Sequence, residues 1–201
     1  MEKGLLIVVS GPAGSGKGTV NAMLLESEEY AFSVSATTRD PRPGEVHGKN
    51  YLYITREDFE GRIARGEMLE HTVYCDNYYG TPLKEAMEVL ESGRNLILEI
   101  EVEGAMNVKR RYPDAVLIML LPPSFAVQEA RLRGRATETE DCILKRLERT
   151  KSEVALLNHY DYVVYNRDNG AGICADDIRA IVRAEKCSVR RHAKASEDYF
   201  V

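Results

Sequence analysis

One segment near the start of the chain has the residue types and the spacing of a loop that binds a chain of phosphates. Glycines stand first, fourth and sixth in it, and a lysine follows the last of them. Glycines let successive backbone N–H groups point at one anion, and a helix that begins there adds the positive end of its dipole. The lysine would reach the outer phosphates of a nucleoside triphosphate. The segment consists of Gly11, Pro12, Ala13, Gly14, Ser15, Gly16 and Lys17.

The surroundings of this segment separate the phosphate-loop interpretation from the alternative, a glycine-rich turn with an incidental lysine. An apolar run precedes it and a helical pattern follows it, which is the context that the motif requires. The next residue departs from the motif, which has Ser or Thr there to hold Mg²⁺, whereas this chain has Gly18. Thr19 comes one residue later, and one residue along a helix is a rotation of about 100°. We therefore expect Mg²⁺ to depend more on the nucleotide, water and carboxylates.

A second candidate anion site lies in a proline-rich loop. Arg39 and Arg42 stand three residues apart on either side of Pro41. Arginine binds phosphate through two parallel hydrogen bonds and keeps its charge when it is buried. Taken alone, the pair is equally consistent with a solvated surface turn.

Two carboxylates mark the end of an apolar run further along the chain. Glu99 and Glu101 follow residues 96–98 at the point where a buried strand would finish. Ligands of open α/β sheets bind outside the carboxyl ends of the strands, so both side chains are candidates for a ligand site. The alternative is that they are charges that solvate the strand end.

The elements that must position these residues alternate between two kinds. Apolar runs typical of strands buried on both faces occur at residues 5–10, 96–100, 115–121 and 162–165. Helical patterns occur at residues 17–28, 82–92, 102–111, 124–133, 137–157 and 176–189, with Thr81 and Thr137 as expected N-caps of the second and fifth. This alternation predicts an α/β fold, a parallel sheet with helices on both faces. Together with the phosphate-loop motif after the first strand, it leads us to expect a fold of the P-loop NTPase type.

Two segments interrupt that alternation. After a short strand pattern at 32–36, residues 36–81 contain further short strand patterns at 51–54, 69–73 and 78–81, and a helix that Thr55 caps and that runs to about Arg65. They predict a small mixed lobe inserted in the core. An Arg- and Gly-rich stretch at 131–135 marks a second, shorter insert. We therefore expect a single domain over residues 1–201, with an inserted lobe at about 36–81 and a lid at about 124–142.

Composition and charge exclude several classes of protein. The formal net charge is −5, which argues against a general nucleic-acid coat and against binding to an anionic membrane. The longest apolar runs, residues 5–9 and 116–121, are far below the roughly 20 residues that span a bilayer. The four cysteines, at 75, 142, 174 and 187, have neither zinc-ligand nor regular disulfide spacing. We expect a cytoplasmic protein that is not exported and has no obligatory protein partner.

The ordered set of motifs resembles the guanylate kinases from residue 5 to about residue 168. Beside the phosphate loop, the resemblance rests on Ser35, Thr37-Thr38-Arg39, Pro41-Arg42, Gly44-Glu45, Tyr51, Leu69-Glu70-His71, Asn77-Tyr78-Tyr79-Gly80, Pro122-Pro123-Ser124 and the segment from Arg131 to Glu138. Each motif alone is weakly specific, whereas the ordered set at matching separations is very specific. The chain departs from the family pattern where it has Glu99 and Glu101 instead of aspartates, and Glu103 instead of glutamine.

The resemblance implies a role for each matching position. Arg39, Arg42, Tyr51 and Tyr79 match residues that hold the GMP phosphate. Ser35 and Thr81 match hydroxyls on guanine O6, and Glu70 matches the carboxylate on guanine N1–H and N2–H. Glu99 matches a carboxylate of the Mg²⁺ region, with Thr19 as the other candidate metal ligand, and Glu101 matches one at the guanine amino edge. Arg135 and Arg146 match arginines that reach the ATP phosphates, and the ATP set is completed by Gly18, Thr19 and, near the adenine, Asn166.

The implied reaction transfers the γ-phosphoryl group of ATP to GMP, and to dGMP as well, by direct in-line displacement. Lys17, Arg39, Arg42, Arg135 and Arg146 would supply positive charge, and no general base is needed. Three alternatives are another P-loop nucleoside monophosphate kinase, a peptide-binding scaffold module and a regulatory GTPase. The set Ser35, Glu70 and Thr81 argues against the first, the retained Lys17 against the second, and the missing switch signatures against the third.

Overall fold

A computed structural model describes residues 3–74, 76–134, 139–192 and 199–200 of the chain. Its main sheet has five parallel strands in the order β2-β7-β1-β8-β9. The strands are β1 (Leu6–Ser10), β2 (Tyr30–Phe32), β7 (Asn95–Glu99), β8 (Val116–Leu121) and β9 (Tyr162–Tyr165). Every residue of β1 and β8 is buried, as their continuous apolar sequences require.

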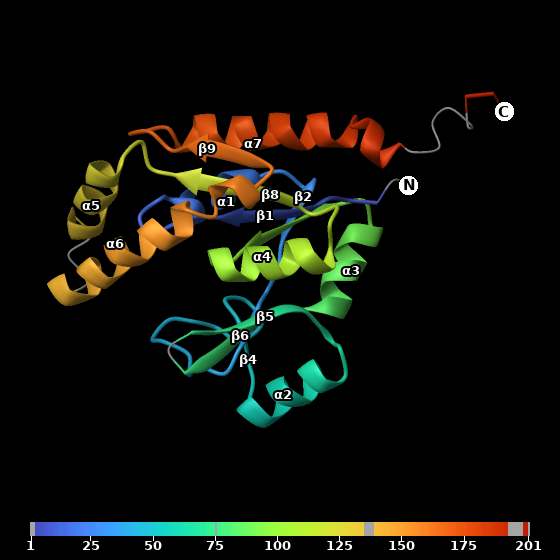
Figure 1. The fold of residues 1–201 in the computed structure, drawn as a ribbon. Coiled ribbons are helices and arrows are strands. Elements are labelled where there is room, and N and C mark those ends of the chain that lie inside the picture. Colours follow the sequence, from blue (N-terminus) through green and yellow to red (C-terminus); the bar gives the residue numbers. More distant parts are fainter. Residues whose placement is uncertain (1–2, 75, 135–138, 193–198, 201) are drawn as a thin grey trace.

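Helices cover both faces of this sheet, so that alternate residues of β1 enter two different cores. Ile7 and Val9 pack with α1 (Lys17–Leu24) and α7 (Ala171–Lys186). Leu6 and Val8 pack with α3 (Leu83–Glu91) and α4 (Val102–Arg111) on the opposite face. Figure 1 shows α7 above the sheet and α4 below it. The expected P-loop NTPase architecture is confirmed.

A second sheet forms a separate lobe. Its order is β4-β3-β6-β5, with antiparallel pairing of β6 to both of its neighbours. The strands are β3 (Ala36–Thr37), β4 (Leu52–Tyr53), β5 (Met68–Tyr74) and β6 (Asn77–Pro82), and α2 (Arg56–Ala64) packs on them through its buried Phe59. The Thr55 hydroxyl accepts from Asp58 N at 3.1 Å, so the expected cap is confirmed. In Figure 1 the lobe lies beyond α3 and α4.

Two more helices lie where the strands of the main sheet end: α5 (Phe125–Gly134) and α6 (Glu140–Val154). The expected cap of α6 was wrong. Thr139, and not Thr137, is the N-cap, and its hydroxyl accepts from Cys142 N at 3.4 Å. Thr137 lies outside the described residues. Beyond α6, a short 3₁₀ turn spans Leu157–His159.

Other boundaries differ from the predictions for local reasons. The expected strand at 32–36 is two strands, because β2 joins the main sheet and β3 joins the lobe. Helix α1 ends at Leu24, four residues early, before a turn in which the Ser27 hydroxyl accepts from Glu29 N at 3.3 Å. Helix α7 begins at Ala171, five residues early, because the buried Cys174 extends its apolar face in spite of nearby glycines.

The end of α7 depends on one buried carboxylate. Glu185 is 3% exposed and accepts from the Tyr162 hydroxyl at 2.6 Å and from Arg191 Nε at 3.0 Å. Burial raises the pKa of Glu185, but these hydrogen bonds and the charges of Arg190 and Arg191 outweigh burial, so the pKa lies below its ordinary value. Arg191 also donates to the Asp114 carbonyl at 2.8 Å, which joins the segment after α7 to the start of β8.

Glu185→Gln is expected to lower the free energy of unfolding at pH 7 by about 2 kcal/mol, because the arginines lose a buried partner. The pKa of Glu185 is lowered by folding, so this difference is present above the unfolded pKa and disappears as the pH falls through the folded pKa. Urea unfolding at several pH values measures it. Glu148→Gln, which removes an exposed ion pair with Lys151, is the control and should change stability by less than about 0.5 kcal/mol.

Candidate active site

The glycine-rich segment forms a loop between β1 and α1. Its glycines allow conformations that other residues rarely adopt, with φ of +144° at Gly11 and +90° at Gly16. A side chain at Gly16 would also place its Cβ 2.3 Å from Asn166 Nδ2. The Ser15 hydroxyl is buried and has no hydrogen-bond partner among the described residues, so it is available to a ligand. The loop therefore has the conformation and the orphan donor expected of a phosphate site.

Lys17 begins α1 and lies against the same loop. Its Nζ donates to the carbonyls of Gly11 at 2.6 Å and Pro12 at 3.3 Å. These contacts keep the ammonium group beside the loop, where it is predicted to bind the phosphates of a nucleotide. Gly18 and Thr19 are exposed on the first turn of α1.

Two buried side-chain carboxamides donate hydrogen bonds to backbone carbonyls of the loop. Gln128 on α5 donates to the Ala13 carbonyl at 2.9 Å, and Asn166, which follows β9, donates to the Ser15 carbonyl at 2.8 Å. Asn166 thus lies at the loop, although its contact with adenine stays a prediction. Gln128 was not predicted as a site residue, because one polar residue in a helical pattern carries no sign that it is buried.

The second candidate anion site lies in the lobe, where its arginines are organised around a carboxylate of the chain itself. Both oxygens of Glu45 accept from Arg39, at 2.9 and 3.1 Å, and Glu45 also accepts from the backbone of Arg42 at 2.8 Å and the Tyr53 hydroxyl at 2.7 Å. The Arg42 backbone and Tyr53 hydrogen bonds, with Arg39, lower the pKa of Glu45 to about 2. An environment that stabilises one negative charge this strongly is suited to a phosphate.

The aromatic side chains predicted for this site surround Arg39. Its guanidinium carbon lies 5.7 Å from the centre of the Tyr51 ring, and the Tyr51 and Tyr79 rings lie 6.0 Å apart. Three of the four predicted phosphate ligands are therefore close together, while Arg42 contributes its backbone and has an exposed side chain. The roles of Glu45 and Tyr53 were missed, although Glu45 is part of the motif that prompted the resemblance.

Glu70 is a buried carboxylate in the sheet of the lobe. It is 5% exposed on β5 and accepts from the Thr81 hydroxyl on β6 at 2.9 Å. Burial raises the pKa of Glu70 to about 7, against the hydrogen bonds from Thr81, which lower it. Gly104 of α4 leaves room for the carboxylate, since a Cβ there would lie 3.4 Å from Glu70 Oε2. Ser35, the other predicted guanine contact, is half-buried beside β3.

The expectation that Thr81 caps α3 was therefore wrong. Pro82 is the N-cap of that helix, and no side chain caps it. Thr81 pairs with Glu70 in the β5–β6 ladder, so the two side chains share one face of the lobe sheet. The hydroxyl is used in the site instead of at the helix end.

The two strand-end carboxylates face different neighbours. Glu99, the last residue of β7, accepts from Asn21 of α1 at 2.8 Å, and Asn21 Oδ1 is buried with no partner in the described part of the chain. Glu101 is the N-cap residue of α4, without a side-chain hydrogen bond to that helix, and pairs with Arg149 of α6 at 3.5 Å. Arg149 also pairs with the buried Glu153 at 3.0 Å. The structure thus brings Glu99 to the phosphate-loop helix and Glu101 to α6.

The two arginines predicted to reach the ATP phosphates are only partly described. Arg146 is half-buried on α6, the helix that also carries Arg149. Arg135 lies outside the described residues. Its neighbours on α5 pair with carboxylates: Arg131 with Asp168 at 3.0 Å, and Arg133 with Glu129 at 2.8 Å.

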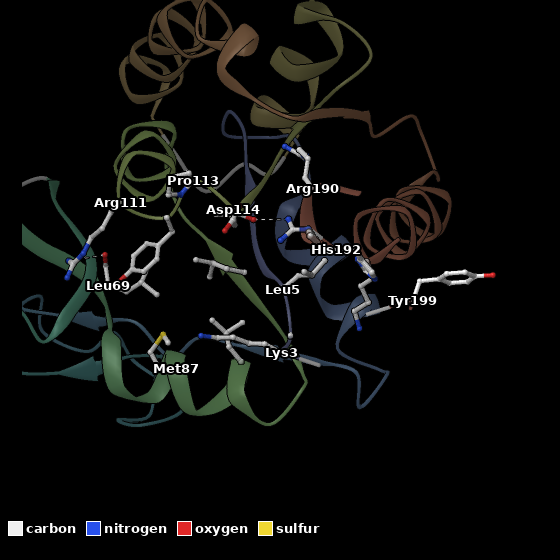
Figure 2. Close-up of a pocket in the computed structure, with 17 residues that line it drawn as sticks. Lys3, Leu5, Leu69, Met87, Arg111, Pro113, Asp114, Arg190, His192 and Tyr199 are labelled. Carbon is white, nitrogen blue, oxygen red and sulfur yellow. Dashed lines mark hydrogen bonds between the residues drawn. The ribbon is translucent and has the colours of Figure 1, made fainter. Parts of the chain in front are cut away.

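A cavity of about 1100 Å³ opens at the opposite end of the sheet, where β1 begins (Figure 2). Apolar side chains such as Leu5 and Met87 line it together with cations such as Lys3 and Arg111. None of the predicted site residues lines it, so it is separate from the two anion sites. Among the described residues, no helix is long and apolar enough to span a membrane, and no three metal-ligating side chains of His, Cys, Asp or Glu gather at one point.

A phosphate loop on a parallel sheet, joined to a lobe with an anion site and a buried carboxylate, defines a P-loop nucleoside monophosphate kinase. Comparison with known proteins identifies the family: the sequence model of the protein family described as guanylate kinase matches residues 3–176 of this chain. The chain belongs to the guanylate kinase family, whose members phosphorylate GMP with ATP.

Individual relatives agree with this assignment. The chain is 50% identical to a guanylate kinase of Halalkalibacterium halodurans, over 94% of this chain and 93% of that protein. It is 47% identical to one of Lactococcus lactis, over 94% and 92% of the two chains. The crystal structure of a guanylate kinase from Anaplasma phagocytophilum superimposes with a TM-score of 0.76 at 32% identity, covering 94% of this chain and 90% of that one.

Proposed function

We propose that the two anion sites divide the reaction of the family between them. The phosphate loop binds ATP, the lobe binds GMP, and the γ-phosphoryl group passes directly to a GMP phosphate oxygen with ADP and GDP as products. The observation that carries this proposal is the buried pair of Glu70 and Thr81 on the lobe that also holds the Arg39 anion site. A nucleotide that binds at Arg39 and at Glu70 together must have a phosphate for the arginine and a base with adjacent hydrogen-bond donors for the carboxylate.

Guanine has those donors in N1–H and N2–H, and a carboxylate can accept both. Adenine presents a lone pair at N1, which the same carboxylate repels. A buried site of this kind can reject the wrong base by on the order of 10⁴-fold, because its polar groups are then left unpaired. Ser35 and Glu101 are further proposed contacts to guanine, and the Thr81 hydroxyl, which donates to Glu70 in this structure, would turn its hydrogen to guanine O6. Because the proposed contacts fall on the base and the phosphate, dGMP is expected to be a substrate as well.

The transfer itself requires position and positive charge. The second pKa of a phosphate monoester is near 6, so the attacking oxygen of GMP is already ionised at neutral pH and needs no general base. The barrier comes from bringing two polyanions together and from the charge on the equatorial oxygens. In this proposal the positive charge comes from Lys17, Arg39, Arg42, Arg135 and Arg146.

The residues at the phosphate loop fit a magnesium ion held mostly by its nucleotide. Glu99 is an oxygen ligand next to α1, and the unpartnered Oδ1 of Asn21 lies beside it. Mg²⁺ commonly keeps several waters and takes one or two protein carboxylates, so a single carboxylate with Gly18 in the usual hydroxyl position is sufficient. Glu99, with Thr19 as the second candidate, would hold the ion, which neutralises charge on the β- and γ-phosphates.

Closure of the site completes the proposal. We infer one domain over residues 1–201, in which the lobe at about 36–81 and the lid at about 124–142 move toward the core when both nucleotides bind. Support comes from the separate small core of the lobe, formed by Ala36, Phe59 and Met68. Closure excludes water, which would otherwise accept the phosphoryl group. We place the enzyme in the cytoplasm, where its substrates are, without nucleic acid, membrane or obligatory protein partner.

The proposed substrate is tested by measuring ADP release with ATP and each of GMP, dGMP, AMP, CMP and UMP. We expect kcat/KM for GMP to exceed that for AMP by about 10⁴-fold. The pyrimidine nucleotides should also be poor substrates, because neither cytosine nor uracil presents two adjacent donors to Glu70. Comparable turnover of AMP and GMP would contradict the role given to Glu70.

A further inference from the structure

A buried hydrogen-bond relay joins the phosphate loop to both α5 and α6. Gln128 of α5 is 1% exposed, and its Nε2 donates to the Ala13 carbonyl at 2.9 Å and to the Thr150 hydroxyl of α6 at 2.7 Å. Thr150 is 5% exposed, and its hydroxyl donates onward to the Arg146 carbonyl at 3.0 Å. The relay thus runs from the loop, through one side chain of each helix, to the backbone of α6.

The chemistry of the relay requires a carboxamide at position 128. The Ala13 carbonyl only accepts, and the Thr150 oxygen must accept as well, because its own hydrogen is used on the Arg146 carbonyl. One uncharged group with two donors on a single atom satisfies both, and the NH₂ of Gln128 is such a group. An apolar side chain of the same length would leave the partly buried Ala13 carbonyl without this donor, and a glutamate would direct a negative oxygen at it.

Packing reinforces the relay at the same point of the loop. The Ala13 side chain packs against a cluster formed by Leu132 of α5 and Ile143 and Leu147 of α6. A Cβ at Gly14 would lie 3.3 Å from the Leu132 side chain. The apex of the loop is therefore enclosed by α5 and α6, and its position depends on how those helices sit.

We propose that Gln128 and Thr150 are positioning residues for ATP. They hold the Ala13 carbonyl so that the N–H groups of the loop face the triphosphate, and they tie that geometry to the stretch of α6 that carries Arg146. Neither side chain needs to touch a nucleotide. The proposal rests on the proposed function of the phosphate loop as the ATP site.

The test compares the binding of each nucleotide to variants of the full chain by calorimetry, with a non-hydrolysable ATP analogue as one ligand and GMP as the other. Gln128→Met keeps the length of the side chain and removes both donors. We expect the Kd of the ATP analogue to rise about tenfold, equivalent to 1.4 kcal/mol, and the Kd of GMP to change less than twofold. The KM for ATP should rise in parallel with the Kd.

Thr150→Val tests the other half of the relay and remains informative if Gln128→Met does not fold. It keeps the shape of the residue but removes the hydroxyl, and we expect a rise of several fold in the Kd of the ATP analogue. Thr150→Ser restores the hydroxyl and should return the Kd to within twofold of the unaltered protein. Ser152→Ala is the matched control, because Ser152 makes the same kind of bond, to the Arg149 carbonyl at 2.7 Å, on the exposed side of α6.

Three results would overturn the proposal. They are an unchanged ATP-analogue affinity in Gln128→Met or Thr150→Val, an equal loss of affinity for both nucleotides, and a failure of Thr150→Ser to rescue. Lys17→Ala serves as the reference for the ATP site itself. If Lys17→Ala weakens the ATP analogue and the relay variants do not, the relay alone is wrong. If Lys17→Ala has no effect either, the ATP site is wrong and the relay proposal is overturned with it.

Discussion

Replacing Lys17 with alanine is expected to lower kcat by about 10³-fold. The ammonium group contacts the carbonyls that begin the phosphate loop, and the motif places it on the outer phosphates, where negative charge is greatest during transfer. Removal of one preorganised donor to a developing charge costs about 10²–10³ in rate, and a cation on a transferring phosphoryl group is worth still more. Steady-state ADP release with saturating GMP measures the loss.

The effect should be confined to catalysis and ATP binding. The midpoint of thermal unfolding should stay close to that of the unaltered protein, because Lys17 is half-buried and its ammonium group donates to two loop carbonyls without filling the core. Lys84→Ala is a suitable control, since Lys84 lies on the exposed surface of α3 in a weak 3.9 Å pair with Glu88. A Lys17→Ala protein that turns over at the control rate would place the γ-phosphate elsewhere.

The parts of this site that were predictable from the sequence are those that local rules determine. The loop at residues 11–17 needs glycine at positions 11, 14 and 16, where the backbone φ is positive. The neighbouring residues in the chain form the strand and the helix that the motif requires. The buried strands β1 and β8 follow from continuous apolar runs. In each case the deciding interactions lie within a few residues, so a pattern in the chain is sufficient.

The parts that were missed depend on residues far apart in the chain. Thr81 has the sequence pattern of a helix cap, but pairing with β5 places its hydroxyl against Glu70, eleven residues away. Gln128 contacts Ala13 across 115 positions, and no periodicity reveals that a polar residue of a helix faces a loop carbonyl. The residues 32–36 were divided between two sheets because strand pairing, which a local pattern does not specify, decides which sheet each end joins.

Glu70→Gln is expected to weaken GMP binding by about 10²–10⁴-fold while leaving ATP binding nearly unchanged. The carboxylate accepts both N1–H and N2–H of guanine, whereas the amide can accept only one and directs its NH₂ at the other. Hydrogen bonds to a charged group are worth about 1.5–3 kcal/mol each, and a buried site loses most when a group is left unpaired. Titrations with GMP and with an ATP analogue separate the two effects, and equal losses would place Glu70 outside the base pocket.

The same variant should also show how the protonation of Glu70 affects the stability of the folded protein. Folding raises the pKa of Glu70 from 4.5 to about 7, so its contribution to stability is fully present below pH 4.5 and is lost as the pH rises through 7. The free energy of unfolding of Glu70→Gln, relative to the unaltered protein, should therefore rise by about 3 kcal/mol over that range, at 1.36 kcal/mol per pKa unit.

The effect of pH on GMP binding is opposite to its effect on stability, because guanine binds the ionised carboxylate of Glu70. The affinity of the unaltered protein for GMP should increase between pH 6 and pH 8 by more than that of Glu70→Gln, and the comparison removes the titration of the GMP phosphate itself. Parallel pH profiles would mean that the carboxylate is already ionised before GMP binds, or does not meet the base. Divergent profiles would mean that GMP supplies the two donors which make a buried negative charge at Glu70 stable, and that loss of a proton accompanies recognition of the base.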